Sequence, residues 1–105
     1  RFGAAGLANL QLASFMLVSD PRSAQNILAN LVADSTAEQH LGYDGLGRAH
    51  LLLAQVCLGQ GDIACALRHI TPALAILRDA LGDHAAPLAE LKQLRTQVER
   101  LTVHR

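Results

Sequence analysis

The sequence matches itself when it is shifted by 42 residues, and this internal repeat restricts the possible folds more than any other feature. The shift superimposes acidic, small and large aliphatic residues at matching places: Asp20 on Asp62, Ala24 on Ala66, Leu28 on Ile70 and Ala33 on Ala75. It also superimposes Leu10, Leu52 and Leu94, and the small residues Ala5, Gly47 and Ala89. A repeated unit of this length cannot bury its apolar face alone, so neighbouring units must stack on a shared core. The repeat predicts a set of buried residues: Ala24, Leu28, Leu52, Leu53, Ala66, Ile70 and Leu94.

Helix-breaking residues divide the chain into five helical segments, which we place at residues 3–19, 21–33, 46–59, 63–81 and 87–103. Asp20-Pro21 and Asp62 are helix start signals, because an aspartate caps the first backbone N–H groups and a proline suits the first turn. Residues 34–45 are polar and contain glycine, so we expect a loop there. Pro72 predicts a kink in the fourth helix, with a complete break as the alternative. No segment has the two-residue period of a strand, so the predicted fold is all-α: a short right-handed solenoid of about five helices arranged as antiparallel hairpins.

Composition agrees with this fold and argues against nucleic-acid and membrane partners. Half of the 105 residues are hydrophobic but only 3% are aromatic, which disfavours a sandwich or barrel and allows one domain with a real core. Nine basic and nine acidic residues give a formal net charge of zero, and the basic residues are spread singly along the chain. The most apolar stretch, residues 3–18, contains Asn9, Gln11 and Ser14 and is too short to cross a bilayer. The sequence therefore predicts neither a nucleic-acid nor a membrane partner.

The two cysteines are too few to staple a small secreted domain. We therefore expect free thiols in a reducing compartment and a cytoplasmic protein. The chain begins at Arg1 without an apolar leader, and we interpret it as a segment excised from a larger protein.

One stretch carries a family resemblance. Leu53-Ala54 in one expected helix, Gly61-Asp62-Ile63 in the turn, and Ala66, Ile70 and Ala73 in the next helix make residues 49–67 resemble a tetratricopeptide repeat. Residues 80–84, followed by Pro87, are similar to the 42-residue variety of kinesin light chains and bacterial regulators. The resemblance implies a single helical-repeat domain over residues 1–105, with a degenerate repeat at 3–33, the best repeat at 46–81 and a capping helix at 87–103.

The resemblance also implies a protein-interaction module whose first helices line a concave groove for a peptide or protein partner. The groove positions that it assigns are Arg48, Leu51, Gln55 and Leu58, to which the internal repeat adds Asn9, Met16, Glu90, Gln93 and Gln97. The alternative is a regulatory or oligomerisation arm of a multidomain transcription regulator or signalling ATPase, without a peptide ligand. It follows from residues 3–18, whose many large apolar side chains exceed what one neighbouring helix can cover. We expect a neighbouring repeat or subunit to pack there.

One set of residues has the composition of a metal site: His50, Cys57, Cys65 and His69. Two thiolates and two imidazoles suit tetrahedral zinc, but the spacing matches no compact zinc motif and cysteine is often a buried core residue. Cys65, His69 and Asp62 also supply the residue types of a nucleophilic site, although capping already explains Asp62 and no oxyanion-stabilising loop follows. We therefore expect core packing at these positions, and no metal, no cofactor and no enzyme activity.

Overall fold

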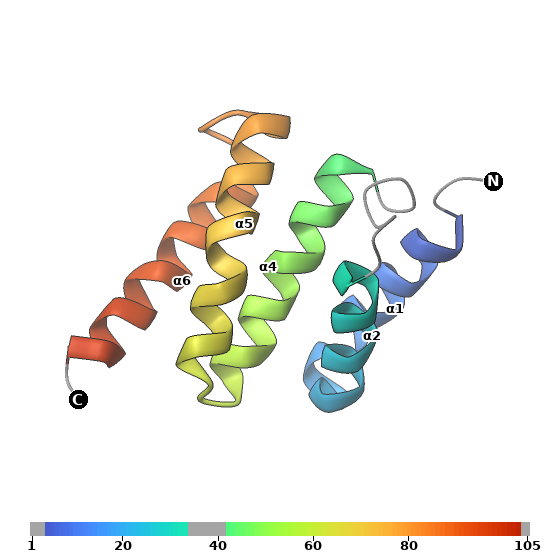
Figure 1. The fold of residues 1–105 in the computed structure, drawn as a ribbon, viewed down its shortest axis with the longest axis horizontal. Coiled ribbons are helices and arrows are strands. Elements are labelled where there is room, and N and C mark those ends of the chain that lie inside the picture. The colour runs from blue at the N-terminus through green and yellow to red at the C-terminus, as the bar shows by residue number, and fades with distance from the viewer. Residues whose placement is uncertain (1–3, 34–41, 104–105) are drawn as a thin grey trace.

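The described part of the chain is entirely helical and loop, without a strand. The computed structural model describes the backbone of residues 4–33 and 42–103, and the side chains of residues 8–33 and 42–102. Its helices are α1 (Ala4–Ser19), α2 (Pro21–Ala33), α4 (Tyr43–Gly59), α5 (Ile63–Leu81) and α6 (Ala86–Val103), shown in Figure 1. The predicted all-α class with five helices is confirmed.

Two expected boundaries need correction. The helix predicted from residue 46 begins at Tyr43, after Gly42 with a φ of 77°, and the Leu46 N–H donates to the Gly42 carbonyl at 3.0 Å. The rest of the predicted loop, residues 34–41, lies outside the described residues. The sequence predicted a kink at Pro72, with a complete break as the alternative; the alternative is wrong, because α5 is continuous from Ile63 to Leu81. Buried neighbours at Ile70 and Ala73 hold this helix against the core on both sides of the proline, and such packing outweighs a proline cost of about 3 kcal/mol.

Both predicted aspartate caps are formed, with nearly equal geometry. The Ser23 N–H donates to Asp20 Oδ1 at 3.2 Å, and the Cys65 N–H donates to Asp62 Oδ1 at 3.1 Å. Hydrogen bonds from Ser23 hold the pKa of Asp20 below its usual value. The start of each second helix is thus set by residues local to its own turn.

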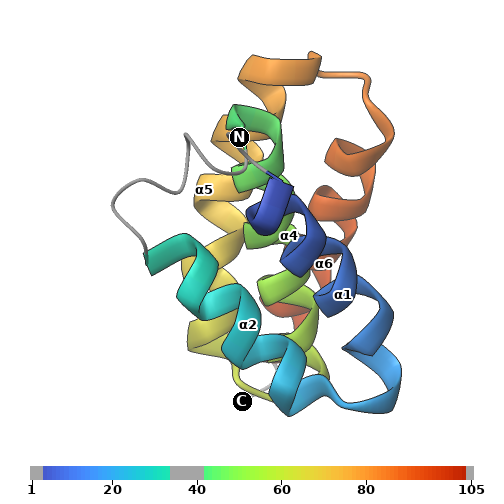
Figure 2. The ribbon, with the colours of Figure 1, turned by 90° about the vertical axis from the view of Figure 1, so that its right-hand side faces the viewer.

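The helices form two layers, and only one of them has contacts between all its neighbouring helices. Helices consecutive in the chain pack on each other, and α4 also contacts both α1 and α6, whereas α2 and α5 make no contact within the described residues. Figure 2 shows α2 and α5 on one side, with α1 and α6 on the other. Within the described residues, the α1–α4–α6 layer is therefore the one whose helices contact each other throughout.

Two hydrophobic cores share α4. The first joins α1, α2 and α4 through Leu10, Ala13, Ala24, Leu28, Ala49 and Leu53. The second joins α4, α5 and α6, and includes Leu51, Ala54, Cys57, Ala66, Ile70, Leu77, Leu88, Leu91 and Val98. Of the expected core residues, Leu52 and Leu94 are only half-buried, while the other five are buried. The close approach of α4 and α5 depends on Gly47, where an added Cβ would lie 2.7 Å from Leu77 Cγ.

Burial shows that the repeat length differs between the two helices of a hairpin. In the second helices, Ala24 and Leu28 match Ala66 and Ile70 at an offset of 42, and all four are buried. In the first helices, the burial pattern instead matches at an offset of 41: Leu10, Ala13, Met16 and Leu17 correspond to Leu51, Ala54, Cys57 and Leu58. The turn after α1 is the single residue Asp20, whereas the turn after α4 is residues 60–62, and in this alignment α1 runs one residue further than α4. The first hairpin is therefore one residue shorter between matched positions of its two helices, which accounts for the difference. One residue corresponds to a rotation of about 100° around a helix, so the change of offset from 42 to 41 alters which α1 side chains are expected to face solvent.

Candidate functional site

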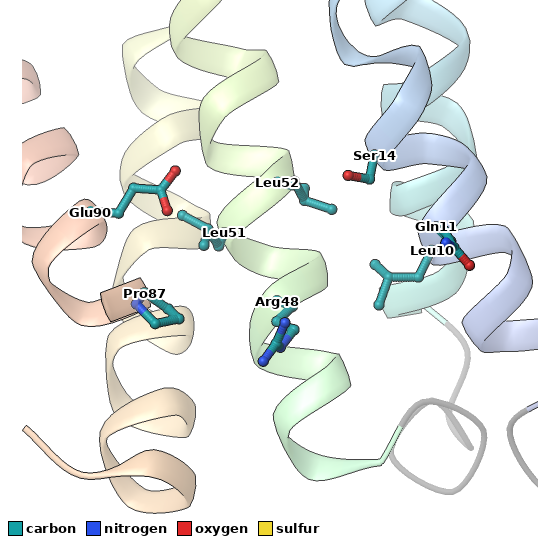
Figure 3. Close-up of a pocket in the computed structure, with 8 residues that line it drawn as sticks. All are labelled: Leu10, Gln11, Ser14, Arg48, Leu51, Leu52, Pro87 and Glu90. Carbon is teal, nitrogen blue, oxygen red and sulfur yellow. The ribbon is translucent and has the colours of Figure 1, made fainter. Parts of the chain in front are cut away.

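A groove crosses the α1–α4–α6 layer. It is lined by Leu10, Gln11 and Ser14 of α1, Arg48, Leu51 and Leu52 of α4, and Pro87 and Glu90 of α6, as Figure 3 shows. Its volume is about 330 Å³, near the lower end of the range of about 300–1,000 Å³ for ligand sites. A hollow of this size accepts one or two side chains of a longer ligand.

The groove has an apolar floor and a polar rim. Leucines from two helices and Pro87 form the floor, and the exposed side chains of Gln11, Ser14, Arg48 and Glu90 form the rim. Glu90 accepts a hydrogen bond from the Gln55 amide, which ties α4 to α6 beside the groove. Within the described part of the chain Arg48 makes no ion pair, so its guanidinium is available to a ligand.

The structure brings part of the predicted site together here. Arg48, Leu51 and Glu90 line the groove, and Gln55 borders it through its bond to Glu90. Leu51, however, is only 6% exposed and belongs to the second core, so it supports the floor from below. Leu52 was expected in the core. It is instead half-buried and lines the groove.

Several groove residues were missed because the sequence comparison used one offset for the whole chain. At an offset of 41, Leu10 matches Leu51 and Gln11 matches Leu52, and both α1 residues line the groove. An offset tested separately for each helix of the hairpin could have found them. At the same offset Ser14 matches Gln55, which was a predicted groove position. Pro87 carries no such signal, because its place in the groove depends on how the three helices meet.

The other predicted positions lie elsewhere. Leu58 and Gln97 line a second hollow of about 320 Å³ with Arg100 and Leu101, and Gln93 lies on the exposed surface of α6. Asn9 is exposed, and Met16 packs against the first core.

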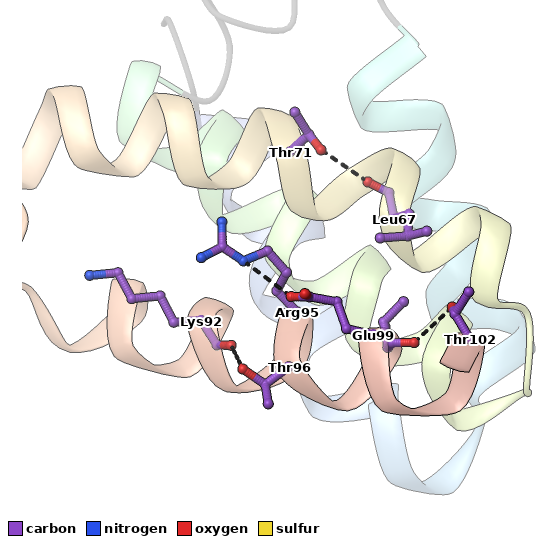
Figure 4. A network of polar contacts seen from close by, with 8 residues as sticks. Leu67, Thr71, Lys92, Arg95, Thr96, Glu99 and Thr102 are labelled. Carbon is purple, nitrogen blue, oxygen red and sulfur yellow. Dashed lines mark hydrogen bonds and ion pairs between the residues drawn. The ribbon is translucent and has the colours of Figure 1, made fainter. Parts of the chain in front are cut away.

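The exposed surface of α6 is occupied by local polar contacts (Figure 4). Thr96 and Thr102 donate to carbonyls one turn earlier, both at 2.9 Å, and Arg95 pairs with Glu99 at 3.8 Å. The polar side chains of this surface thus bond within α6 and are exposed to solvent.

The four candidate metal ligands meet as two separate pairs. Cys57 and Cys65 form a disulfide with a Cα–Cα distance of 5.7 Å, and His50 Nδ1 lies 2.9 Å from His69 Nδ1. His50 and Cys57 are seven residues apart on one helix, or about 10 Å along its axis. Among the described residues no group of three or more His, Cys, Asp or Glu side chains could hold a metal ion.

Burial, and then the neighbouring His69, lower the pKa of His50 to about 4. Burial, and then Arg68, lower the pKa of His69. The histidine pair is therefore neutral near pH 7, with one Nδ1–H donating to the other Nδ1.

The disulfide overturns the expectation of free thiols. It removes Cys65 as a nucleophile beside His69, so the catalytic arrangement considered from the sequence is not formed. The spacing of Cys57 and Cys65 gave no signal for the bond, which depends on the end of α4 and the start of α5 lying side by side. Over the described residues, no helix combines the length and the apolar character of a membrane span.

Comparisons with known proteins add no assignment. No protein-family model matches the chain, and searches of curated proteins and of solved structures gave no match. The candidate site is therefore judged on its own geometry and on the sequence resemblance.

Proposed function

We propose that this chain is a protein-interaction module of the tetratricopeptide type, which holds a peptide segment of a partner in the groove between α1, α4 and α6. The observation that carries the proposal is the groove itself, where alternate helices contribute an apolar floor and a polar rim. Leucine side chains give a peptide apolar surface to bury, while Arg48 and Gln11 offer hydrogen bonds that set its direction.

Two further observations support a binding role. The α1–α4–α6 layer, in which α4 contacts both α1 and α6, supports the proposal because the first helices of a tetratricopeptide module form its binding surface. Both cysteines are consumed in the disulfide, and His50 is paired with His69, so these side chains serve structure. Binding therefore accounts for the groove without any catalytic group.

The test is a selection of peptides from a random display library on the full chain, followed by affinity measurements on the selected peptides. Arg48→Glu reverses a charge on the rim, and Leu52→Glu places a charge on the floor. We expect each to weaken binding at least tenfold, as expected where a central interface residue is lost (about 1 kcal/mol or more). Arg22→Glu, an equal charge reversal at an exposed position on α2, should leave affinity unchanged.

Nuclear magnetic resonance supplies the second measurement. Selected peptides should shift the amide signals of groove residues such as Leu10, Arg48 and Glu90. Peptides that bind equally well to the Arg48→Glu and Leu52→Glu variants, with shifts confined to α2 and α5, would contradict the proposal.

A further inference from the structure

One face of α1 is uncovered although its counterpart on α4 is buried. At the offset of 41 that burial defines for the first helices, Leu12 and Phe15 correspond to Leu53 and Val56. Leu12 is 48% exposed and Phe15 75%, against 1% for Leu53 and 5% for Val56. The α1–α2 hairpin covers the α4 face, and the described residues leave the α1 face open.

Val18, at 94% exposure, continues the same uncovered surface by one turn, and Ala8 begins it. We call Ala8, Leu12, Phe15 and Val18 the α1 end face. Large aliphatic and aromatic side chains spaced along one helix face are typical of an interaction surface rather than of a solvated one. α4 buries the positions that match Ala8, Leu12 and Phe15 against another helical hairpin, whereas the position that matches Val18 is the exposed Gly59. The shape of the α1 end face around Leu12 and Phe15 therefore suits helix packing.

The opposite end of the molecule is built differently. At an offset of 42, the α4 residues that pack on α5 correspond to polar, exposed residues of α6: Gln93, Thr96, Glu99 and Arg100. Apart from Leu101, which is 49% exposed, the exposed residues described at this end are mostly polar or charged, so it offers much less apolar surface than the α1 end face. Head-to-tail association, which would form an open chain of molecules, is therefore disfavoured.

The absence of charge on α1 favours the remaining arrangement, in which the α1 end faces of two molecules meet. α1 carries no charged residue in its sixteen positions. Two α1 end faces can thus meet without like-charge repulsion, and a patch that is apolar throughout is complementary to itself. A two-fold axis requires this property, because it brings the same patch of each molecule together.

We propose that the chain forms a symmetric dimer, in which the α1 end faces of two copies pack against each other and the α6 ends point outward. The partner is a second copy of this chain. One helix face per molecule buries less than the roughly 1,200 Å² that separates weak from stable interfaces, so we expect a dissociation constant of about 10–100 µM. This self-association is distinct from peptide binding, because Leu12 and Phe15 do not line the groove and the contact uses none of the Arg48 surface.

Analytical ultracentrifugation of the full chain over a concentration series tests the proposal. We expect the mass to rise from 11.2 kDa toward twice that value and to stop there. Phe15→Glu should weaken the dimer at least tenfold, and Val18→Glu should have the same direction of effect. Both positions are exposed, so circular dichroism should show unchanged helix content.

Thr96→Glu is the matched control, because it adds the same charge at an exposed position on the α6 end. It should leave the dimer intact, and Arg48→Glu should do so as well. A chain that stays monomeric at several hundred micromolar would overturn the proposal. So would masses that keep growing beyond a dimer, or a dimer that Thr96→Glu dissociates and Phe15→Glu does not.

Discussion

Helices α1 and α4 begin two hairpins of similar pattern, and they differ in how many neighbours cover them. α4 is buried on opposite faces by two cores, whereas α1 contributes to one core and leaves Leu12 and Phe15 in solvent. The large apolar side chains are alike in the two helices. The comparison teaches that in a repeat protein the burial of a residue is decided by the adjacent unit as much as by its own.

The largest expected difference is in the free energy of unfolding lost when equivalent leucines of α1 and α4 are replaced by alanine. Leu53→Ala should lower the free energy of unfolding by about 2–5 kcal/mol, because it leaves a cavity in the first core. Leu12→Ala should change it by less than about 0.5 kcal/mol at micromolar concentration, where the chain is monomeric. The sequence led us to expect the full core penalty at Leu52, but that side chain is half-buried, so Leu52→Ala should fall between the two. Urea unfolding gives all three values, and equal losses for Leu12 and Leu53 would contradict the difference between the helices.

A second prediction concerns the close contact of α4 with α5. Gly47→Ala should destabilise the chain by about 1–3 kcal/mol, because the new methyl group would collide with Leu77 and Ile76. The higher helix propensity of alanine offsets at most about 1 kcal/mol of this. Gly59→Ala is the matched control, since nothing lies within 4 Å of its added Cβ, and it should be neutral or stabilising. If both substitutions stabilise the protein, the two helices are not as close as described.

A third prediction concerns the pH dependence of stability. Of the two hairpins, only the second contains the histidine pair, His50 and His69. The positions of His50 and His69 are Asn9 and Ile27 in the first hairpin. Because the pKa of His50 falls to about 4 in the folded state, the unfolded chain binds its proton first as pH drops. The contribution of neutral His50 to the free energy of unfolding is complete above about pH 6.5 and is lost progressively as the pH falls from there to 4.

The loss should be about 1–2 kcal/mol, after allowance for the partial exposure of the ring. Urea unfolding at pH 7 and pH 4.5 measures it. His50→Gln should remove most of this difference, while His84→Gln, at an exposed turn residue, should not. A His50→Gln variant with unchanged pH dependence would show that the buried pair is not responsible.

The smallest expected effect is one that the two hairpins share. Asp20→Ala and Asp62→Ala should each cost about 1 kcal/mol, because each removes one cap hydrogen bond of nearly the same length. Thermal unfolding should show similar losses for the two variants. Ser substitutions, which keep a capping oxygen, should recover most of each loss. A large inequality would mean that the caps, like the leucines, depend on what surrounds each hairpin.

The sequence by itself determined the features that depend on residues close together in the chain. Helix periodicity, the Asp20 and Asp62 caps, and the glycine-containing turn before α5 specified five helices and their order. Such interactions act within one or two turns, so each segment carries its own signal. The family resemblance assigned Arg48 to a groove and the internal repeat added Glu90, and both are exposed residues that line the groove.

Only the tertiary structure decided which apolar side chains are covered, because that depends on contacts between distant segments. The packing of α4 on α5 and α6 places Leu51 in the core and leaves Leu52 half-buried in the groove, the reverse of the expected roles. Among the described residues, no segment covers Phe15 on α1. The groove needs three helices that are separated in the chain, and the disulfide and the histidine pair need α4 and α5 to be packed. Pro72 stays within a continuous helix for the same reason: packing energy from residues far away in the sequence exceeds a local penalty.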